Sequence, residues 1–375
     1  MIYDNDNTYP NASQIPSLLK KIQDQTSVLH LMPTEHVVDG DDKYLLSHLA
    51  NGRFVIKPNI TQQGFLYYGN CQGKEFKKNF ISKYYPTGDN IEDCHKVLML
   101  NNVRLEQFKL LIETFPLYEL LEKGIYIPDL GIKFSIGNPY GLASAYGLPS
   151  PYINLTSSID VAMFYATNRY DEHNDRFEPI VDDSLGIIYI FMLKAPIGQT
   201  VDLSTLGIQI FPRTHNTKQF QYVLAPFANF NDKKEVFGLP FHQNEYVSNH
   251  YSRLFDEGRK LQPTDDVLSR KIKSINGKIY EEAIDINIQK NPNETKTKNM
   301  KILEGNNITI IDDEKLMFSK SDLAGVDLES MWYAFVKKIT PQNERELKLV
   351  EYLRMLPTKE EYRKYFNLNR YYEKR

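Results

Sequence analysis

One stretch of the chain, AYGLPSPYINLTSSIDVAMFYAT (145–167), restricts the fold more than any other part of the sequence. Its Gly-Leu-Pro segment (147–149) has turn chemistry, because Gly permits a positive φ and Pro fixes its own. The residues PYINLT (151–156) are aromatic and β-branched, which favours a strand. Ser157 or Ser158 then suits the N-cap of the apolar helix that follows. The stretch therefore predicts a turn, a strand and a capped helix.

Patterns on both sides of this stretch predict an α+β fold. Strands are predicted over 51–59, 64–73, 185–195 and 219–224, and helices over 15–32, 89–115, 116–124 and 157–169. Gly69 interrupts the second strand, which is typical of a bulge or of a close backbone approach. A mixed or antiparallel sheet with flanking helices accommodates these elements.

The length of 375 residues allows two domains, or one large domain with an appendage. We predict a helical lead-in over 1–49, an α+β domain over 50–260, and a mixed, then helical, C-terminal region over 261–375. The end of that region is expected to form a smaller helical appendage. The polar, Pro-broken segment NPNETKTKN (291–299) is the predicted linker.

Composition and charge exclude several classes of function. The formal net charge of -3 gives no general attraction to nucleic acid or to an anionic membrane. No apolar run approaches the ~18 residues of a membrane helix, and the start of the chain lacks the pattern of a signal peptide. The cysteines, Cys71 and Cys94, form neither a disulfide framework nor a zinc set, and we expect reduced thiols in a cytoplasmic protein. The eight histidines show no metal-ligand spacing, so we predict no metal. Because no membrane helix is predicted, we also predict no membrane partner.

The order of residues in 145–167 matches a known family signature. That signature has a His-Tyr-Gly-Leu-Pro-Thr turn, a Leu-Asp-Trp-Thr strand, a Ser-Pro step, and a helix with Val-Ala and Phe-Ala. The matching residues are Tyr146, Gly147, Leu148, Pro149, Ser150, Thr156, Ser157, Val161, Ala162, Phe164 and Ala166. The chain thus resembles the FRG domain, a bacterial module named for a Phe-Arg-Gly motif, with Gly69 as the glycine of that motif. The resemblance covers residues 50–230.

FRG domains are in turn similar to ADP-ribosyltransferases in the layout of three segments, which implies that fold and NAD as the ligand. The implied ligand-binding residues are Tyr68, Gly69, Tyr146, Asn154, Thr156, Ser157 and Ser158. The implied residues at the reacting end are Gln219, Gln221 and His215. In this analogy Tyr68 stacks on or bonds the ligand, and Thr156 and Ser157 bond the nucleotide.

The departures from the family pattern concern polar residues. Tyr68 stands where the family usually has an Arg, Ala145 replaces a His, and Pro151 and Asn154 occupy positions that are commonly Arg and Asp. Each expected site residue also has a structural explanation. The Thr-Ser-Ser step can serve only as a corner, a Gln can point outward from an edge strand, and His215 can be an exposed loop residue.

Cleavage of the nicotinamide glycosidic bond passes through an oxocarbenium-like state that a carboxylate stabilises. Gln221 does not supply that charge, so either another acid such as Glu235 or Glu106 does, or the domain binds without turnover. Two functions therefore stay open. The first is an enzyme that transfers ADP-ribose from NAD or hydrolyses NAD. The second is a non-catalytic module that recognises a nucleotide, a nucleic acid or a protein partner.

Overall fold

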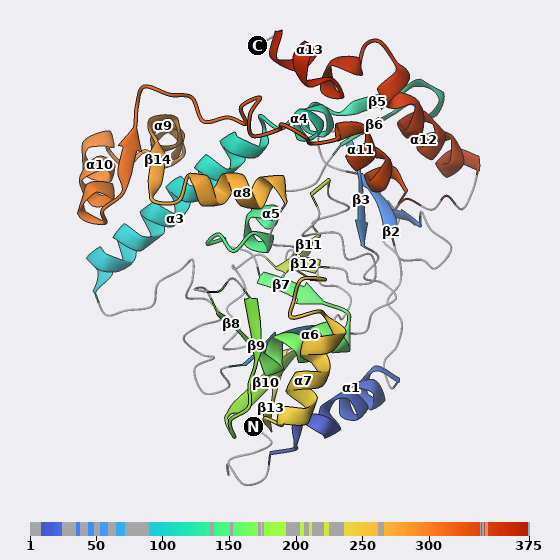
Figure 1. Cartoon of the computed structure of the whole chain (residues 1–375), viewed down its shortest axis with the longest axis vertical. Coiled ribbons are helices and arrows are strands. Elements are labelled where there is room, and N and C mark those ends of the chain that lie inside the picture. Colours follow the sequence, from blue (N-terminus) through green and yellow to red (C-terminus); the bar gives the residue numbers. More distant parts are fainter. Residues whose placement is uncertain are drawn as a thin grey trace.

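Figure 1 shows the computed structural model of the chain. The structure describes residues 9–24, 35–37, 44–48, 53–58, 65–71, 90–135, 139–150, 153–171, 174, 176–192, 203–205, 210–211, 221–224, 236–261, 266–337, 339, 341 and 344–373. Helices and small sheets are interspersed along these ranges, so the predicted α+β class is confirmed.

The largest sheet contains the strands on which most of the expected site residues lie. Its strands are β4 (Phe65–Asn70), β7 (Ile153–Thr156), β10 (Leu185–Met192), β11 (Leu203–Thr205), β12 (Gln221–Leu224) and β13 (Val236–His242). They lie in the order β11-β12-β7-β4-β10-β13, and every neighbouring pair is antiparallel.

The second sheet has the order β1-β2-β3-β6-β5, with β3 and β6 parallel. Its strands are β1 (Glu35–Val37), β2 (Tyr44–His48), β3 (Arg53–Pro58), β5 (Ile125–Ile127) and β6 (Ile132–Phe134). Two further pairs are the antiparallel β8 (Asn168–Asp171) with β9 (Arg176–Pro179), and the parallel β14 (Lys278–Tyr280) with β15 (Thr309–Ile311).

The helices fall into a lower and an upper group in Figure 1. The lower group is α1 (Ile15–Asp24), α6 (Ile159–Thr167) and α7 (Glu245–Leu254). The upper group is α3 (Ile91–Ile112), α4 (Pro116–Lys123), α5 (Pro139–Ala145), α8 (Val267–Ser274), α9 (Glu281–Lys290), α10 (Lys296–Gly305), α11 (Leu328–Val336), α12 (Glu344–Met355) and α13 (Leu368–Glu373). Short 3-10 turns are η2 (Ala12–Gln14), η3 (Pro128–Leu130), η7 (Leu356–Thr358) and η8 (Arg363–Tyr365).

Helix α6 lies directly on the six-stranded sheet because two glycines leave room for its backbone. A Cβ atom at Gly69 would lie 1.8 Å from the carbonyl oxygen of Ala162, and one at Gly186 would lie 2.8 Å from that of Ala166. Side chains of α6 then pack with Tyr67 and the neighbouring strands in one buried cluster, the sheet core, which runs from Ala12 to Leu261. The close approach predicted at Gly69 is thus an approach of α6.

The C-terminal helices share a second buried cluster, the helical core, with residues from the middle of the chain. Phe335 of α11 lies beside Phe134 of β6, with ring centroids 6.4 Å apart. The hydroxyl of Tyr371 in α13 donates to the carbonyl oxygen of Thr114 at 3.0 Å. The expected helical appendage is therefore packed into the same core as α3 and α4, because its apolar faces complete theirs.

The predicted linker over 291–299 is wrong in its second half. Helix α10 begins at Lys296, and the Thr295 hydroxyl accepts a hydrogen bond from the Lys298 N–H at 3.3 Å as its cap. The side chain of Asn299 is fully buried. The first turn of this helix happens to be polar, so composition alone gave it the appearance of a loop. The expected 1–49 lead-in also contains the strands β1 and β2.

Candidate functional site

The corner from β7 into α6 is built as the sequence predicts. Ser158 is the N-cap of α6, and its hydroxyl accepts a hydrogen bond from the Val161 N–H at 3.4 Å. The hydroxyl of Thr156 accepts from the Ser158 N–H at 3.1 Å, which tightens the step between strand and helix. Thr156 is buried, and Ser157 and Ser158 are half-buried. Both bonded hydroxyls therefore serve the local backbone.

The three segments named from the ADP-ribosyltransferase layout lie on neighbouring strands. Thr156 of β7 is the register partner of Gln221 in β12 on one side and of Tyr67 in β4 on the other. Asn154 of β7 pairs with Val223 of β12. At the level of the backbone, the fold thus places the three segments side by side in one sheet.

The expected ligand-binding side chains nevertheless divide between the two faces of the sheet. Directly opposed residues of an antiparallel pair share a face, and successive residues alternate between faces. Thr156 opposes Tyr67, so it lies on the face that α6 covers. Tyr68 lies on the other face. The expectation that Tyr68, Gly69 and Thr156 surround one ligand is therefore not met, because the pleat separates Tyr68 from the other two.

Tyr68 forms an aromatic pair on its own face. It opposes Tyr189 of β10, and the two ring centroids are 6.4 Å apart with an interplanar angle of 44°. Burial raises the pKa of the Tyr68 phenol, and the nearby Cys71 adds to the rise. Burial also raises the pKa of Tyr189. Both phenols stay neutral in the physiological range, so this face offers aromatic surface and hydroxyl groups rather than a base.

Arg169 brings a positive charge to the end of β4. Burial raises the pKa of the Cys71 thiol, while the charge and hydrogen bond of the Arg169 guanidinium oppose the rise. The thiol therefore remains mostly protonated near neutral pH, which argues against a nucleophilic role, since the thiolate is the reactive form. The groups near this end of β4 are therefore the guanidinium of Arg169, the thiol of Cys71 and the ring of Tyr68.

Tyr146 lies away from the sheet. Its hydroxyl donates to the carboxylate of Asp266 at 3.2 Å, and it belongs to the helical core. Asp266 is the N-cap of α8 and accepts from the N–H groups of Leu268 and Ser269, each at 2.9 Å. The expected ligand contact of Tyr146 is thus replaced by a bond that holds the cap residue of a helix.

Of the two acids proposed from the sequence, Glu106 is already paired with a cation. Glu106 is buried on α3, where both carboxylate oxygens lie 2.7 Å from the Lys290 ammonium, and Tyr140 donates to it at 3.1 Å. It contacts none of the sheet residues named above. Gln219, His215 and Glu235 lie outside the described residues, and for Gln221 and Asn154 only the backbone is described.

Two residues near Tyr68 were not predicted from the sequence, Tyr189 on the neighbouring strand and Arg169 at the end of β4. Tyr189 lies in the apolar run LGIIYIFM. Alternation along this strand places its side chain on the other face of the sheet from Ile188 and Ile190, which are buried. Arg169 follows the end of α6 and carries no motif. Among the described residues no group of three or more His, Cys, Asp or Glu side chains is arranged to hold a metal ion.

Comparisons with protein-family models, with curated proteins and with solved structures find no significant match to this chain. Within the part of the chain that the structure describes, no helix is long and apolar enough to cross a membrane.

Proposed function

We propose that this chain is an FRG-type protein with an ADP-ribosyltransferase-like core that binds a nucleotide-type ligand such as NAD and does not turn it over. The observation that carries the proposal is the Tyr68–Tyr189 pair on the face of the sheet opposite α6, with Arg169 at the same end of β4 as Tyr68. The base of the ligand stacks on Tyr68, and a phosphate contacts Arg169.

Aromatic and cationic groups at one end of a strand suit a nucleotide for a simple reason. Every base has a π face that stacks on an aromatic side chain, and a guanidinium matches phosphate oxygens in charge and geometry. The adjacency of β4, β7 and β12 supports the transferase-like layout as part of the proposal.

Two observations favour binding over catalysis. The hydroxyls of Thr156 and Ser158 accept backbone hydrogen bonds in the β7–α6 corner. Glu106 is paired with Lys290 in another part of the molecule. Of the two candidate acids, Glu106 is thus engaged elsewhere, and these two hydroxyls already hold the local backbone.

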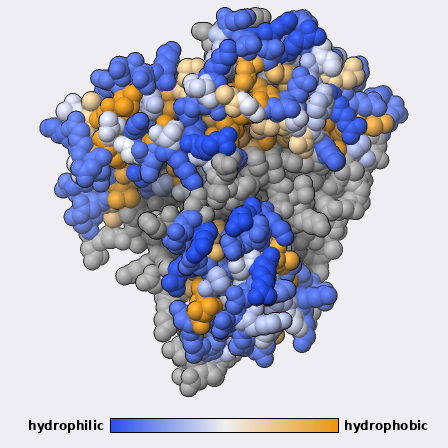
Figure 2. Space-filling view, in the orientation of Figure 1, coloured by the Kyte–Doolittle hydropathy of each residue, from blue (hydrophilic) through white to orange (hydrophobic). Residues whose placement is uncertain are grey.

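The described part of one face shows no large apolar surface of the kind used by obligate protein partners. On the face shown in Figure 2, the described surface is mainly hydrophilic, and its apolar residues form small separate groups. Protein interfaces of an obligate kind present larger contiguous apolar areas. We place the protein in the cytoplasm, because Cys71 and Cys94 are both free thiols.

The test combines thermal melting with an assay of nicotinamide release. NAD, ADP-ribose and AMP should each raise the melting temperature of the full chain, and nicotinamide release should not exceed the buffer control. Tyr68→Phe keeps the ring and should keep the shift. Tyr68→Ala should weaken binding by about 5- to 100-fold, since a stacked base contributes ~1–3 kcal/mol.

Tyr170→Ala is the matched control, because Tyr170 is an exposed tyrosine that contacts Phe177 on the partner strand of the β8–β9 hairpin. It should leave the ligand-induced shift unchanged. Nicotinamide release by the wild-type chain that falls ~10-fold in the Thr156→Ala, Ser157→Ala variant would establish an enzyme instead. Absence of any shift with all three nucleotides would reject the binding proposal.

A further inference from the structure

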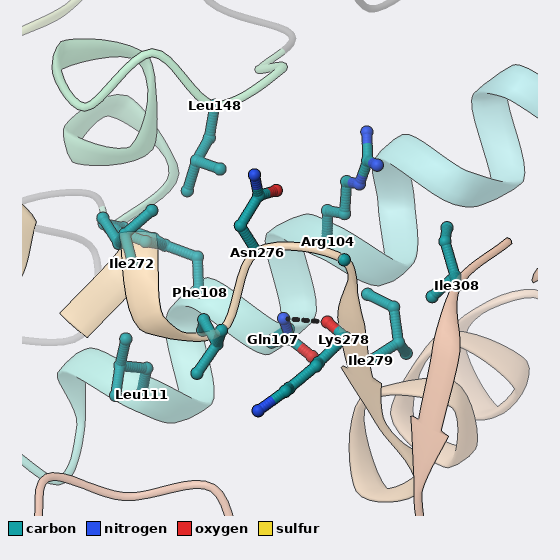
Figure 3. A pocket seen from close by; sticks show the side chains of 12 residues that line it. Arg104, Gln107, Phe108, Leu111, Leu148, Ile272, Asn276, Lys278, Ile279 and Ile308 are labelled. Atoms are coloured by element: carbon teal, nitrogen blue, oxygen red, sulfur yellow. Dashed lines mark hydrogen bonds between the residues drawn. The ribbon is translucent and has the colours of Figure 1, made fainter. Parts of the chain in front are cut away.

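A small pocket lies in the upper part of the molecule, apart from the Tyr68 face. It has a volume of about 60 Å³ and lies between α3 and the connection from α8 to β14 (Figure 3). Its walls are mostly apolar, with Phe108 and Leu111 from α3, Ile272 from α8, and Leu148 from the Gly-Leu-Pro turn. A volume of this size holds a few water molecules or an aliphatic chain of two to four carbon atoms, but not a dinucleotide.

Arg104 of α3 is half-buried in the wall of this pocket. Its guanidinium makes no hydrogen bond or ion pair with any residue in the described part of the chain. Two exposed arginines, Arg176 and Arg259, each pair with a glutamate instead. Burial lowers the pKa of Arg104, and no acidic neighbour among the residues that the structure describes offsets the shift. A partly desolvated cation without a counter-charge is costly, and an anionic group in the pocket would relieve that cost.

Asn276 supplies a second polar group at the opening. It is exposed in the turn between α8 and β14, next to Gly277, whose φ of +75° shapes that turn. Figure 3 shows the side chains of Arg104 and Asn276 both extending upward in the view, Asn276 on the side of Leu148 and Arg104 on the side away from it, whereas Lys278 extends its ammonium downward. Both polar groups therefore lie at the edge of a mostly apolar pocket.

Gln107 lines the same pocket, but its side-chain nitrogen and oxygen are both already hydrogen-bonded within the protein. Its side-chain nitrogen donates to the carbonyl oxygen of Lys278 at 3.0 Å, and its side-chain oxygen accepts from the Tyr280 N–H at 2.9 Å. These bonds fix the start of β14 against α3. Gln107 thus holds the pocket in shape, and Arg104 and Asn276 are left to contact a ligand.

Charge and lining decide the class of ligand. One guanidinium balances one negative charge, whereas a phosphate monoester carries about -1.5 to -2 near neutral pH. A planar carboxylate also matches the fork of a guanidinium with two parallel hydrogen bonds. We propose that this pocket binds a monocarboxylate with a short aliphatic chain, held by Arg104 and Asn276 through its carboxylate and by Phe108 and Leu148 through its chain. This site is independent of the proposed nucleotide site.

The experiment is a thermal-melting titration of the full chain with sodium butyrate, against sodium chloride at matched ionic strength. Butyrate should raise the melting temperature saturably, and inorganic phosphate should require a higher concentration or have no effect. Arg104→Met keeps the apolar stem and removes the charge, so it should weaken butyrate binding by about 10-fold or more. Arg104→Lys should weaken it by about 5-fold, because an ammonium lacks the planar fork.

Arg354→Met is the matched control, since Arg354 is exposed on α12, far from the lining residues in sequence. It should retain the wild-type response to butyrate. Arg104→Met should melt cooperatively without butyrate, at or above the wild-type temperature, which separates loss of binding from loss of fold. An undiminished butyrate shift in Arg104→Met, a stronger response to phosphate than to butyrate, or no shift with butyrate would each overturn the proposal.

Discussion

The β7–α6 corner and the Arg104 pocket use their polar groups in opposite ways. In the corner, the hydroxyls of Thr156 and Ser158 each accept a backbone N–H. In the pocket, the half-buried Arg104 has no partner among the residues that the structure describes. The corner carries the recognisable motif, yet its polar groups are satisfied within the protein. Capacity for a ligand is better judged from polar groups that the fold leaves unsatisfied.

The largest effect should come from Gly69, which tests how rigidly the corner is packed. Gly69→Ala should lower the free energy of unfolding by about 3 kcal/mol, because the new methyl group meets the backbone of Ala162 rather than a movable side chain. Urea unfolding measures the change. Gly305→Ala is the control, since a Cβ there meets nothing within 4 Å. A cost below about 0.5 kcal/mol at Gly69 would mean that α6 can shift away from the sheet.

The next effect contrasts two charged residues of α3: Glu106, which is paired with Lys290, and Arg104, for which no partner is described. Lys290→Met should lower the free energy of unfolding by about 1–2 kcal/mol, because Glu106 then stays buried without its cation. The side chain of Lys290 is 46% exposed, so solvent screening keeps the cost below that of a fully buried pair. Arg104→Met should change stability by less than about 0.5 kcal/mol, since no described partner is lost. Equal costs in denaturant unfolding would remove the contrast.

A smaller effect tests whether the corner hydroxyls act in structure or in binding. Ser158→Ala should lower the free energy of unfolding by about 1 kcal/mol through loss of the α6 cap, and Ser158→Asp should largely restore it. Both variants should bind NAD as the wild type does, measured by the ligand-induced melting shift. An alanine variant of unchanged stability that no longer responds to NAD would instead assign Ser158 to the ligand.

The smallest effect concerns reactivity and leaves stability unchanged. Because burial raises the pKa of Cys71, its alkylation by iodoacetamide should be slower than that of a free thiol at pH 8 and should keep increasing as the pH rises. Arg169→Leu should slow alkylation further, since the guanidinium favours the thiolate. Peptide mass spectrometry follows Cys71 and Cys94 in the same digest. Faster alkylation of Cys71 in the Arg169 variant would contradict this arrangement.

Local features of the fold follow from local sequence signals. The strand over 153–156, the Ser158 cap and the helix over 159–167 agree with the turn, β-branched and capping residues of the motif. Helix α4 ends at Lys123 before Gly124, as the glycine predicts. Each of these depends on residues within a few positions of one another, where propensity and capping dominate.

The arrangement of side chains across the sheet could not be predicted in the same way. Whether Tyr68 and Thr156 share a face depends on strand register, and a shift of one residue reverses every side chain. The environment of Arg104 depends on residues some 170 positions away, such as Asn276, which no local pattern connects to α3. The burial of Asn299 likewise depends on tertiary packing that overrides a polar composition.

The two large cores differ in when they can be completed as the chain is synthesised. The sheet core uses residues from Ala12 to Leu261, so all of its parts have emerged while the last third of the chain is still being made. The helical core extends from Leu105 to Tyr371 and needs the final helix against Thr114. Until translation reaches that helix, the apolar faces of α3 and α4 remain uncovered, and chaperones have their main opportunity to bind there.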